Sequence, residues 1–295
     1  MREYKVNTTY EPFSREPEYI GGNRAFVQQL PLKTAKRVLD LACGTGVISD
    51  LILEVQPSIT IFGLDISRES LMLGLSYFRD RGLSFQDGFI LTGDLVGGQP
   101  RLVLIEGTAD CLPFTDRWAD IVFMGHSIHM LPDLDLLLNE IKRVMAPGGI
   151  FAFNSSFYAG SQAEGTDHFY QLWWKKALTY IFEKDAELKR HGLPGIRRQR
   201  GTYPKGRPWL SNEDWKGLLQ NHGFEIITLN ERTVMMTKSA LENIGSYAGF
   251  ASAALSGYPV KLASEAVVYA VEPALKASGL DRVPRLWLEI AVRKK

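Results

Sequence analysis

The sequence predicts an α/β fold built on a parallel sheet, and three observations lead to this class. Short apolar runs alternate with stretches of helical periodicity over residues 37–153. A glycine turn, Gly44–Gly46, follows the first apolar run directly. An acidic residue, Asp65, ends the second run. Because strands that alternate with helices pair through right-handed crossovers, this order predicts a doubly wound parallel sheet.

The first half of the chain supplies five expected strands and three expected helices. The strands are Arg37–Leu41, Thr60–Asp65, Leu102–Glu106, Asp120–Met124 and Ile150–Phe153. The helices are 47–55, about 69–78 and 134–144, and in the last of these the apolar residues recur at helical spacing. The sequence Pro147–Gly149 is expected to stop that helix before the fifth strand.

The second half contains two long stretches that interrupt the strand-helix alternation. Strands are expected at Phe224–Leu229 and Arg285–Val292, and Ser211–Asp214 has the pattern of a cap that opens a helix to Asn221. Residues 166–190 are expected as one long helix, and 235–280 as helices cut by Pro259 and Pro273. We interpret residues 1–295 as a single domain with a core of about 20–153, 210–234 and 284–295. The cap insertions are then about 154–209 and 235–283.

Composition excludes several classes of function. Lys and Arg total 34 against 33 for Asp and Glu, so no global field for nucleic acid is expected. The cysteines are Cys43 and Cys111, which make neither a disulfide framework nor a cysteine zinc cluster. A reducing cytoplasm is therefore the expected location. We expect no spanning helix, because no uninterrupted apolar run is long enough, and no secretory leader at the charged N-terminus.

The first motif is the run from Val38 to Gly46. A strand that enters a glycine turn lets a ligand approach the backbone at the positive end of the next helix. Asp40 lies before the turn and suits a cationic ligand group better than a pyrophosphate. The dinucleotide fingerprint requires a third glycine where Ser49 stands, which argues against a nicotinamide cofactor.

Two further motifs follow later strands. Asp65 is placed to accept hydrogen bonds from two ribose hydroxyls, with a helix-capping role as the alternative. The stretch Glu106–Phe114 offers polar groups that suit an exocyclic amine, with a plain surface turn as the alternative.

With these motifs in order, the chain resembles the class I S-adenosylmethionine-dependent methyltransferases, and within them the small-molecule type that includes ubiquinone and menaquinone biosynthesis enzymes. Val38–Gly46, Leu64–Asp65, Gly107–Phe114, Asp120–Leu131 and Met145–Gly149 carry the resemblance. It implies a Rossmann-like seven-stranded methyltransferase sheet whose last strand is antiparallel, a mostly helical cap, and S-adenosylmethionine as cofactor. The implied cofactor-binding residues are Asp40, Ala42, Cys43, Gly44, Thr45, Gly46, Asp65, Ile66, Thr108, Ala109, Asp110, Gly125 and His126.

The chain departs from the family pattern at the adenine side. The acidic residue usually follows the glycine directly, but here Thr108 does so and Asp110 comes two positions later. Which of the two contacts the adenine amine stays open. The connection from Tyr77 to Arg101 is also long, and we expect a surface loop there.

The leading functional hypothesis is methyl transfer to a small, largely apolar acceptor of aromatic, quinone-like, polyketide or isoprenoid type. Oxygen and carbon are the favoured acceptor atoms, with nitrogen left open. No Asn-Pro-Pro-Tyr-like string follows the fourth strand, which disfavours amide and nucleobase substrates. The alternatives are a nicotinamide-dependent oxidoreductase and a catalytically inactive methyltransferase-like binding subunit.

Substrate and catalytic residues are the least determined part. Aromatic residues of 166–190 fall near one helical face, and Phe169, Trp173 and Trp174 are the candidate substrate contacts, with packing over the sheet as the alternative. His126, His129 and His168 are the candidate bases, with Glu164 and Asp167 as alternatives. No His, Asp and Glu set has metal-ligand spacing, so no metal is expected.

A basic run lies within 189–207. It comprises Lys189, Arg190, Arg197, Arg198, Arg200, Lys205 and Arg207, and no acidic residue lies among them. The favoured interpretation is a solvated loop. Contact with an anionic substrate group, an acidic carrier protein or an anionic membrane surface is the alternative.

Overall fold

The protein is described by a computed structural model that covers residues 4–80, 101–199 and 208–295. The expected surface loop between Tyr77 and Arg101 falls largely in 81–100, outside the described residues, and so do Arg200, Lys205 and Arg207 of the basic run. Contacts between Cα atoms divide the chain into two compact units. The sheet unit comprises 20–161, 208–232 and 286–295, and the helical unit comprises 4–19, 162–199 and 233–285, within the described ranges.

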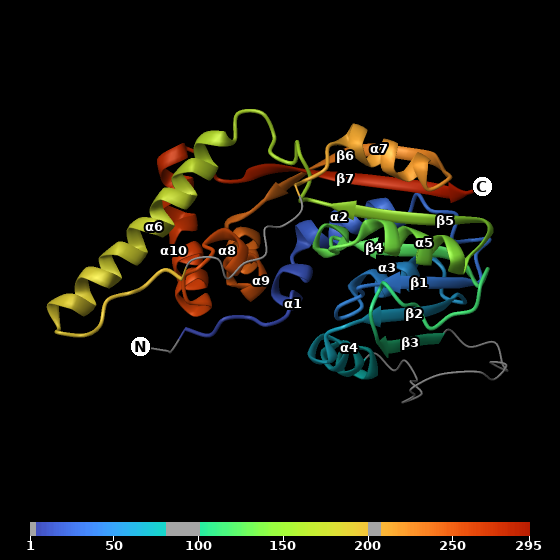
Figure 1. Ribbon diagram of the computed structural model, residues 1–295, viewed down its shortest axis with the longest axis horizontal. Helices are drawn as coiled ribbons and strands as arrows, with labels where there is room; N and C mark the ends of the chain where they lie inside the picture. Colours follow the sequence, from blue (N-terminus) through green and yellow to red (C-terminus); the bar gives the residue numbers. More distant parts are fainter. Residues whose placement is uncertain (1–3, 81–100, 200–207) are drawn as a thin grey trace. The chain divides into compact units, whose positions relative to one another are not determined.

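A seven-stranded sheet organises the chain in the order β3-β2-β1-β4-β5-β7-β6 (Figure 1). Its strands are β1 Arg37–Leu41, β2 Thr60–Asp65, β3 Arg101–Glu106, β4 Ala119–Gly125, β5 Met145–Ser155, β6 Phe224–Met236 and β7 Val283–Lys294. β1 pairs in parallel with β2 and β4, and β5 pairs in parallel with β4 and antiparallel with β7. The expected α/β fold, with its antiparallel last strand, is confirmed.

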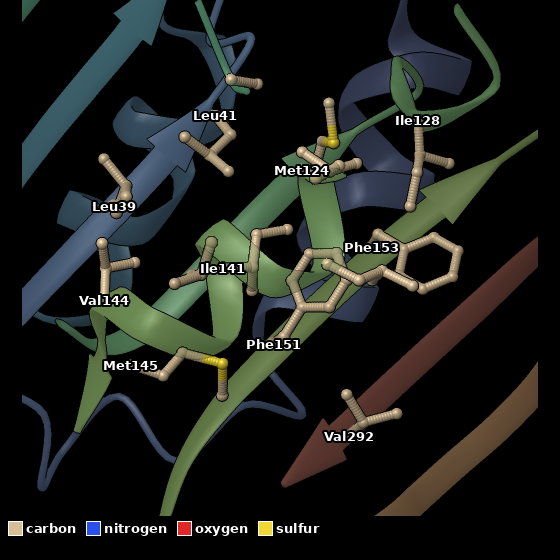
Figure 2. Close-up of a cluster of buried hydrophobic side chains, with 14 of the residues drawn as sticks. Leu39, Leu41, Met124, Ile128, Ile141, Val144, Met145, Phe151, Phe153 and Val292 are labelled. Carbon is tan, nitrogen blue, oxygen red and sulfur yellow. The ribbon is translucent and has the colours of Figure 1, made fainter. Parts of the chain in front are cut away.

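One face of the sheet carries a large buried apolar cluster. Leu39 and Leu41 of β1, Met124 of β4 and Phe153 of β5 point to this face, as Figure 2 shows. Helices α5 (Leu134–Val144) and α7 (Asn212–Asn221) cover it with apolar residues that include Ile141 and Trp215. The period-two alternation of the strands therefore places the even-numbered residues of β1 on the opposite face.

The opposite face is covered by α2 (Pro17–Val27), α3 (Val47–Val55) and α4 (Arg68–Asp80). Phe26 of α2 packs against Phe123 of β4 with ring centroids 5.6 Å apart. The Tyr77 hydroxyl of α4 donates to the Asp50 carboxylate of α3 at 2.9 Å. Polar side chains that project from the strand ends toward this face meet helix termini there, which is the arrangement that positions a ligand site in open α/β sheets.

The helix start that the sequence predicts at Ser211 is confirmed, and the predicted stop after α5 needs one correction. The Ser211 side chain accepts from the Asp214 N–H while the Asp214 side chain accepts from the Ser211 N–H, which is a complete capping box for α7. β5, however, begins at Met145, before the expected stop at Pro147–Gly149. Met145 already pairs with Ala119, and the register shifts before Ile150, so the glycines form an irregular part of the strand.

The helical unit contains α1 (Glu11–Ser14), α6 (Asp167–Arg190), α8 (Lys238–Ser246), α9 (Ala248–Ala254) and α10 (Val260–Ser278). α6 confirms the expected long helix. The segment before α2 was not expected here, yet Asn7 forms a parallel bridge with Tyr247. The N-terminal segment and both long stretches thus supply one unit. The single-domain interpretation, with its core and cap boundaries, stays a prediction.

Pro273 does not cut α10, and the sequence-based expectation there is wrong. The helix runs from Val260 to Ser278 with Pro273 inside it, whereas Pro259 occupies the N-cap position as expected. An internal proline removes one helical hydrogen bond. Burial of Ala270, Val271 and Ala274 around the proline offsets this loss, since tertiary packing of an apolar face outweighs local propensity.

No helix in the described part of the chain is both long and apolar enough to cross a bilayer.

Candidate cofactor site

Asp40 is the first polar side chain at the carboxyl end of β1. Its carboxylate is fully buried, and its Oδ2 accepts a hydrogen bond from the Ser49 hydroxyl at 2.7 Å. Oδ1 is buried and has no hydrogen-bond partner among the described residues. Burial raises the pKa of Asp40 to about 7, against the opposing effect of the Ser49 hydrogen bonds. A cationic group would therefore find an acceptor atom that the protein leaves open.

The turn after β1 has the backbone that its glycines predict. Gly44 and Gly46 have φ values of 56° and 79°, in the left-handed region that favours glycine. A Cβ at Gly44 would meet no atom within 4 Å, so its α-carbon faces open space. Ala42 shares the left-handed conformation with φ 52°, and such strain in a non-glycine residue is typical of ligand-binding loops.

Asp65 joins two loops at the end of β2. Its Oδ2 accepts from the Gly44 N–H and its Oδ1 from the Ser67 N–H, both at 2.7 Å. Burial raises its pKa, and the two backbone hydrogen bonds oppose this shift. A carboxylate has about four acceptor positions, so two remain for ribose hydroxyls. The helix that follows is capped by Ser67, whose Oγ accepts from the Ser70 N–H at 3.2 Å. The ribose contact of Asp65 stays a prediction.

The remaining adenine-side candidates follow β2 and β3. Ile66 is 73% exposed, Thr108 and Asp110 are exposed, and Ala109 is buried. Helix α5 fixes the loop after β3, because Glu140 accepts from the Leu112 N–H at 3.0 Å. Arg143 of the same helix donates to the carbonyl oxygens of Leu112 and Phe114. These contacts with α5 fix the conformation of the loop. Which of Thr108 and Asp110 contacts the adenine amine stays open.

The chain leaves β4 in a strained conformation at His126. Its φ is 49°, and it directly follows Gly125, which ends the strand. The His126 N–H donates to the backbone carbonyl of Asn154 at 3.0 Å and to its Oδ1 at 3.1 Å. The Asn154 Nδ2 in turn donates to Oδ1 of Asn23 at 2.8 Å, and both amides are fully buried. This buried network holds the strained residue in place.

The His126 ring lies against Trp287 of β7. The ring centroids are 4.2 Å apart in an edge-to-face arrangement. Burial, with a smaller contribution from nearby His129, lowers the pKa of His126 to about 3. The imidazole is therefore uncharged at neutral pH, which suits a hydrogen-bonding or van der Waals contact rather than a charged one.

His129 stands in a more open position near the end of β5. It is half-buried in the 3-10 helix Ile128–Met130. Its Nδ1 lies 3.4 Å from the Ser155 hydroxyl, and its ring lies 4.4 Å from that of Phe157. Phe157 packs against Trp209, whose side chain is 50% exposed. His129 thus belongs to an accessible aromatic group at the carboxyl ends of β4 and β5.

The expected substrate residues lie in the helical unit on α6. Trp173 is 2% exposed and donates its indole N–H to the carbonyl of Val267 at 2.8 Å. Trp174 is half-buried, and its ring stacks on Trp173 at 4.8 Å with an interplanar angle of 11°. Phe169 is fully buried, whereas His168 is exposed near the start of the helix. Their roles toward a substrate stay predictions.

Several polar residues of the site were missed by the sequence reasoning. Ser49 was noted only as a missing glycine, yet it holds Asp40. Asn154 and Asn23 fix the backbone of His126. A polar residue at the carboxyl end of a buried strand is a usable signal for Asn154. The partner Asn23 has no such signal, because it lies on a helix that no motif marks.

The arrangement of these residues fits the amino-acid and ribose parts of S-adenosylmethionine. The open Oδ1 of Asp40 suits a cationic amino group, the exposed α-carbon of Gly44 permits close approach, and Asp65 retains acceptor capacity for hydroxyls. Among the described residues, no group of three or more His, Cys, Asp or Glu is arranged to hold a metal ion. The described part of the site therefore offers anchoring for an organic cofactor.

Comparison with known proteins agrees with this fit. Residues 39–153 match the methyltransferase domain family. A demethylmenaquinone methyltransferase from Lactobacillus johnsonii is 34% identical over 212 residues, which cover 72% of this chain and 77% of that protein. A malonyl-[acyl-carrier protein] O-methyltransferase from Methylococcus capsulatus is 26% identical over 238 residues, covering 76% of each chain. The match covers 49%, 62% and 46% of the length of three other demethylmenaquinone methyltransferases.

A solved structure extends the likeness in fold over nearly the whole chain. The phosphoethanolamine N-methyltransferase 2 of Haemonchus contortus, in complex with phosphomonomethylethanolamine and S-adenosylhomocysteine, superposes with a TM-score of 0.52 at 17% identity. The alignment covers 98% of this chain and 60% of that one. Given the motif order, the site geometry and the 34% identical relative, the chain belongs to the class I S-adenosylmethionine-dependent methyltransferases of the small-molecule type.

Proposed function

We propose that this enzyme methylates an electron-rich ring compound of quinone type, at a ring carbon or a ring oxygen. The observation that carries the proposal is the 34% identity over 212 residues to a demethylmenaquinone methyltransferase. The aromatic content of the helical unit supports it, since apolar ring compounds bind among aromatic and aliphatic side chains with few polar groups. The nicotinamide-dependent alternative is not favoured, because the comparisons name methyltransferases.

S-adenosylmethionine, the methyl donor of the family, supplies an activated methyl group on a sulfonium sulfur. The chain's own task is to bind and orient, because proximity supplies most of the rate acceleration in such a displacement. Asp40 would hold the amino group, the Gly44–Gly46 turn would allow close approach, and Asp65 would hold the ribose hydroxyls. Thr108, Ala109 and Asp110 would lie at the adenine side.

A base is required when the acceptor loses a proton. We infer that His129 has this role, because it is half-buried and bonded to Ser155 rather than enclosed. His126 is a weaker candidate, since a pKa of about 3 makes it a poor proton acceptor. His129→Gln should lower turnover by about 10²-fold or more while donor affinity stays within about twofold. His168→Gln, at an exposed position near the start of α6, is the comparison that tests the third histidine.

The direct test is product analysis. The full chain is incubated with methyl-labelled S-adenosylmethionine and reduced demethylmenaquinone, and label in the quinone fraction is measured by mass spectrometry. Labelled menaquinone is the expected product. Donor binding without label transfer to this or any other ring acceptor would instead support the binding-subunit alternative.

A second candidate acceptor is a carboxylate on an acyl chain held by an acidic carrier protein. The likeness to the Methylococcus capsulatus O-methyltransferase favours it, and so does the basic segment that includes Arg190 and Arg197. Arg190 and Arg197 are exposed, whereas Lys189 pairs with Asp185 at 2.6 Å. Methylation of malonyl-carrier protein, lost at high salt and in the Arg190→Glu/Arg197→Glu double variant, would establish this candidate in place of the quinone. Vesicle flotation of the same variants tests the membrane-surface alternative.

A further inference from the structure

The N-terminal segment of the helical unit is built into the unit by polar contacts. The Asn7 N–H donates to the Ser246 carbonyl at 2.9 Å, and the Ala248 N–H donates to the Asn7 carbonyl at 2.8 Å. Farther along, Glu16 accepts hydrogen bonds from Ser239 and Asn243 of α8. The segment between these anchors, which contains α1, therefore has a defined place within the helical unit.

Tyr10 lies between the anchors and is enclosed by aromatic rings. Its ring makes edge contacts with Phe13, Tyr19 and Tyr247 at centroid distances of 5.1, 5.9 and 5.3 Å. Its carbonyl accepts from the Phe13 and Ser14 N–H groups at the start of α1. Because three rings and the helix start fix this residue, its hydroxyl has one fixed position within the unit.

That hydroxyl is buried and has no hydrogen-bond partner among the described residues. A buried polar group without a partner is destabilising, and native proteins retain few of them. Tyr4 of the same segment differs in this respect, because its hydroxyl forms a hydrogen bond of 2.7 Å with the Ser264 hydroxyl of α10. Burial raises the pKa of Tyr10 well above its ordinary value, so the phenol keeps its proton at neutral pH.

The surroundings of the Tyr10 hydroxyl indicate which kind of atom would accept a hydrogen bond from it. Three aromatic rings contact the Tyr10 ring, and such surroundings suit a flat apolar ring rather than a charged metabolite. Arg285, whose charge opposes the rise in the pKa of Tyr10, adds a positive field at the same place. An aromatic wall, a protonated phenol and a nearby positive charge together match an electron-rich oxygen on a ring.

We propose that the Tyr10 hydroxyl binds the methyl acceptor by donating a hydrogen bond to a ring oxygen, of the carbonyl or phenolate type. The proposal rests on the proposed function and names the chain's own polar contact to that acceptor. It assigns the N-terminal segment, which carries no cofactor motif, to acceptor recognition. Tyr10 is then a specificity residue, since an acceptor without the oxygen would leave the buried phenol unsatisfied.

The test uses Tyr10→Phe, which removes only the oxygen atom. The expected result is an unchanged or raised melting temperature, because a buried unpartnered hydroxyl is lost. S-adenosylmethionine affinity should stay within twofold, and kcat/KM for the ring acceptor should fall at least tenfold. Tyr4→Phe is the matched control: it loses a bonded hydroxyl, so its melting temperature should fall while kcat/KM stays unchanged.

Binding of two probes separates this inference from the proposed function. Fluorescence titration compares 1-naphthol with naphthalene, which lacks the oxygen. The wild-type chain should prefer 1-naphthol by at least tenfold, and Tyr10→Phe should lose the preference. If that result holds but no ring compound is methylated, the proposed function fails, and what stands is the binding of a ring oxygen by Tyr10.

The opposite outcomes overturn the Tyr10 assignment alone. Equal affinity of wild type and Tyr10→Phe for 1-naphthol, or no binding of 1-naphthol to the wild type, contradicts it. A kcat/KM within twofold of wild type contradicts it as well. A lowered melting temperature with normal kinetics would show that the hydroxyl has a structural water partner instead.

Discussion

The sheet unit and the helical unit are assembled in different ways. In the sheet unit, β1 pairs with β2 and β2 with β3 in register, so these three strands, which precede the expected cofactor motifs, are neighbours both in sequence and in space. In the helical unit, the contacts join distant segments: Trp173 donates to Val267, and Glu16 accepts from Ser239. Local patterns therefore identify the cofactor site in the first unit, whereas the composition of the second unit depends on long-range packing.

This difference leads to an expected separation of effects. Changes at the expected cofactor residues of the sheet unit should alter donor binding, because Asp40, Asp65 and the glycine turn all lie there. Changes in the helical unit should alter stability or acceptor use and leave donor affinity intact.

The largest effect is expected for Trp173→Ala. The indole is buried, stacks on Trp174 and donates to the Val267 carbonyl, so its removal leaves a cavity and deletes a buried hydrogen bond. The free energy of unfolding should fall by about 3–5 kcal/mol, measured by urea denaturation. Trp174→Ala, at a half-buried position on the same helix, should lower the free energy of unfolding by less. It should also reduce kcat/KM for the acceptor. Normal stability and normal turnover in both variants would refute the substrate-contact interpretation of α6.

Asp65→Ala should produce the next largest change, in donor binding. The variant removes the acceptor of the Gly44 and Ser67 N–H groups together with the expected ribose contact. Donor affinity measured by calorimetry should fall by about 1.5–3 kcal/mol or more. Glu54→Ala is the matched control, because Glu54 is a carboxylate of the same unit that pairs with Arg24 at 3.0 Å and is 40% exposed. A folded Asp65→Ala chain with affinity within twofold of wild type would remove Asp65 from the site.

Asn154→Ala tests the buried amide network. The variant deprives the His126 N–H of one acceptor and leaves the Asn23 oxygen without its donor. The free energy of unfolding should fall by about 1–3 kcal/mol. Turnover should fall as well, because the left-handed conformation of His126 loses support. Asn212→Ala, which removes only an exposed bond to Glu231, is the control and should change stability by less than about 0.5 kcal/mol.

The smallest effect is a pH dependence of donor binding. Burial holds the pKa of Asp40 at about 7, so the unliganded chain keeps this carboxyl protonated below that pH. A cationic amino group binds the ionised form, and binding must therefore release a proton. Affinity should rise roughly tenfold between about pH 5.5 and pH 7, where the ligand's amino group is still charged. Asp40→Asn should flatten this profile, and a flat wild-type profile would contradict the assigned contact.

Stability of the unliganded chain is a less direct measure of Asp40. Its folded pKa lies above the ordinary value of 3.8, so its contribution to stability is present below that value and is lost as pH rises to about 7. His126 acts in the opposite direction. Its folded pKa of about 3 lies below 6.5, so stability is lost as pH falls through that window. The two effects overlap, and calorimetric titration of donor binding separates them.

Local sequence patterns predict the strands of the sheet and place the expected cofactor residues at the strand ends. Helical spacing from Leu134 to Val144 gave the bounds of α5, and Ser211 with Asp214 identified the start of α7. These features are local, because a capping box, a glycine turn and an apolar period act within a few residues of one another. The same locality explains why Asp40, Gly44 and Asp65 were found together at the ends of their strands.

The remaining features depend on partners that are distant in the chain, so they are visible only in the folded protein. Pro273 stays within α10 since burial of the surrounding helix face outweighs a local breaking signal. Asn23 acquires its role from Asn154, and Tyr10 acquires its aromatic surroundings in part from Tyr247. A local sequence pattern does not predict such pairs, because the segment that packs against a residue determines its burial and its hydrogen bonds.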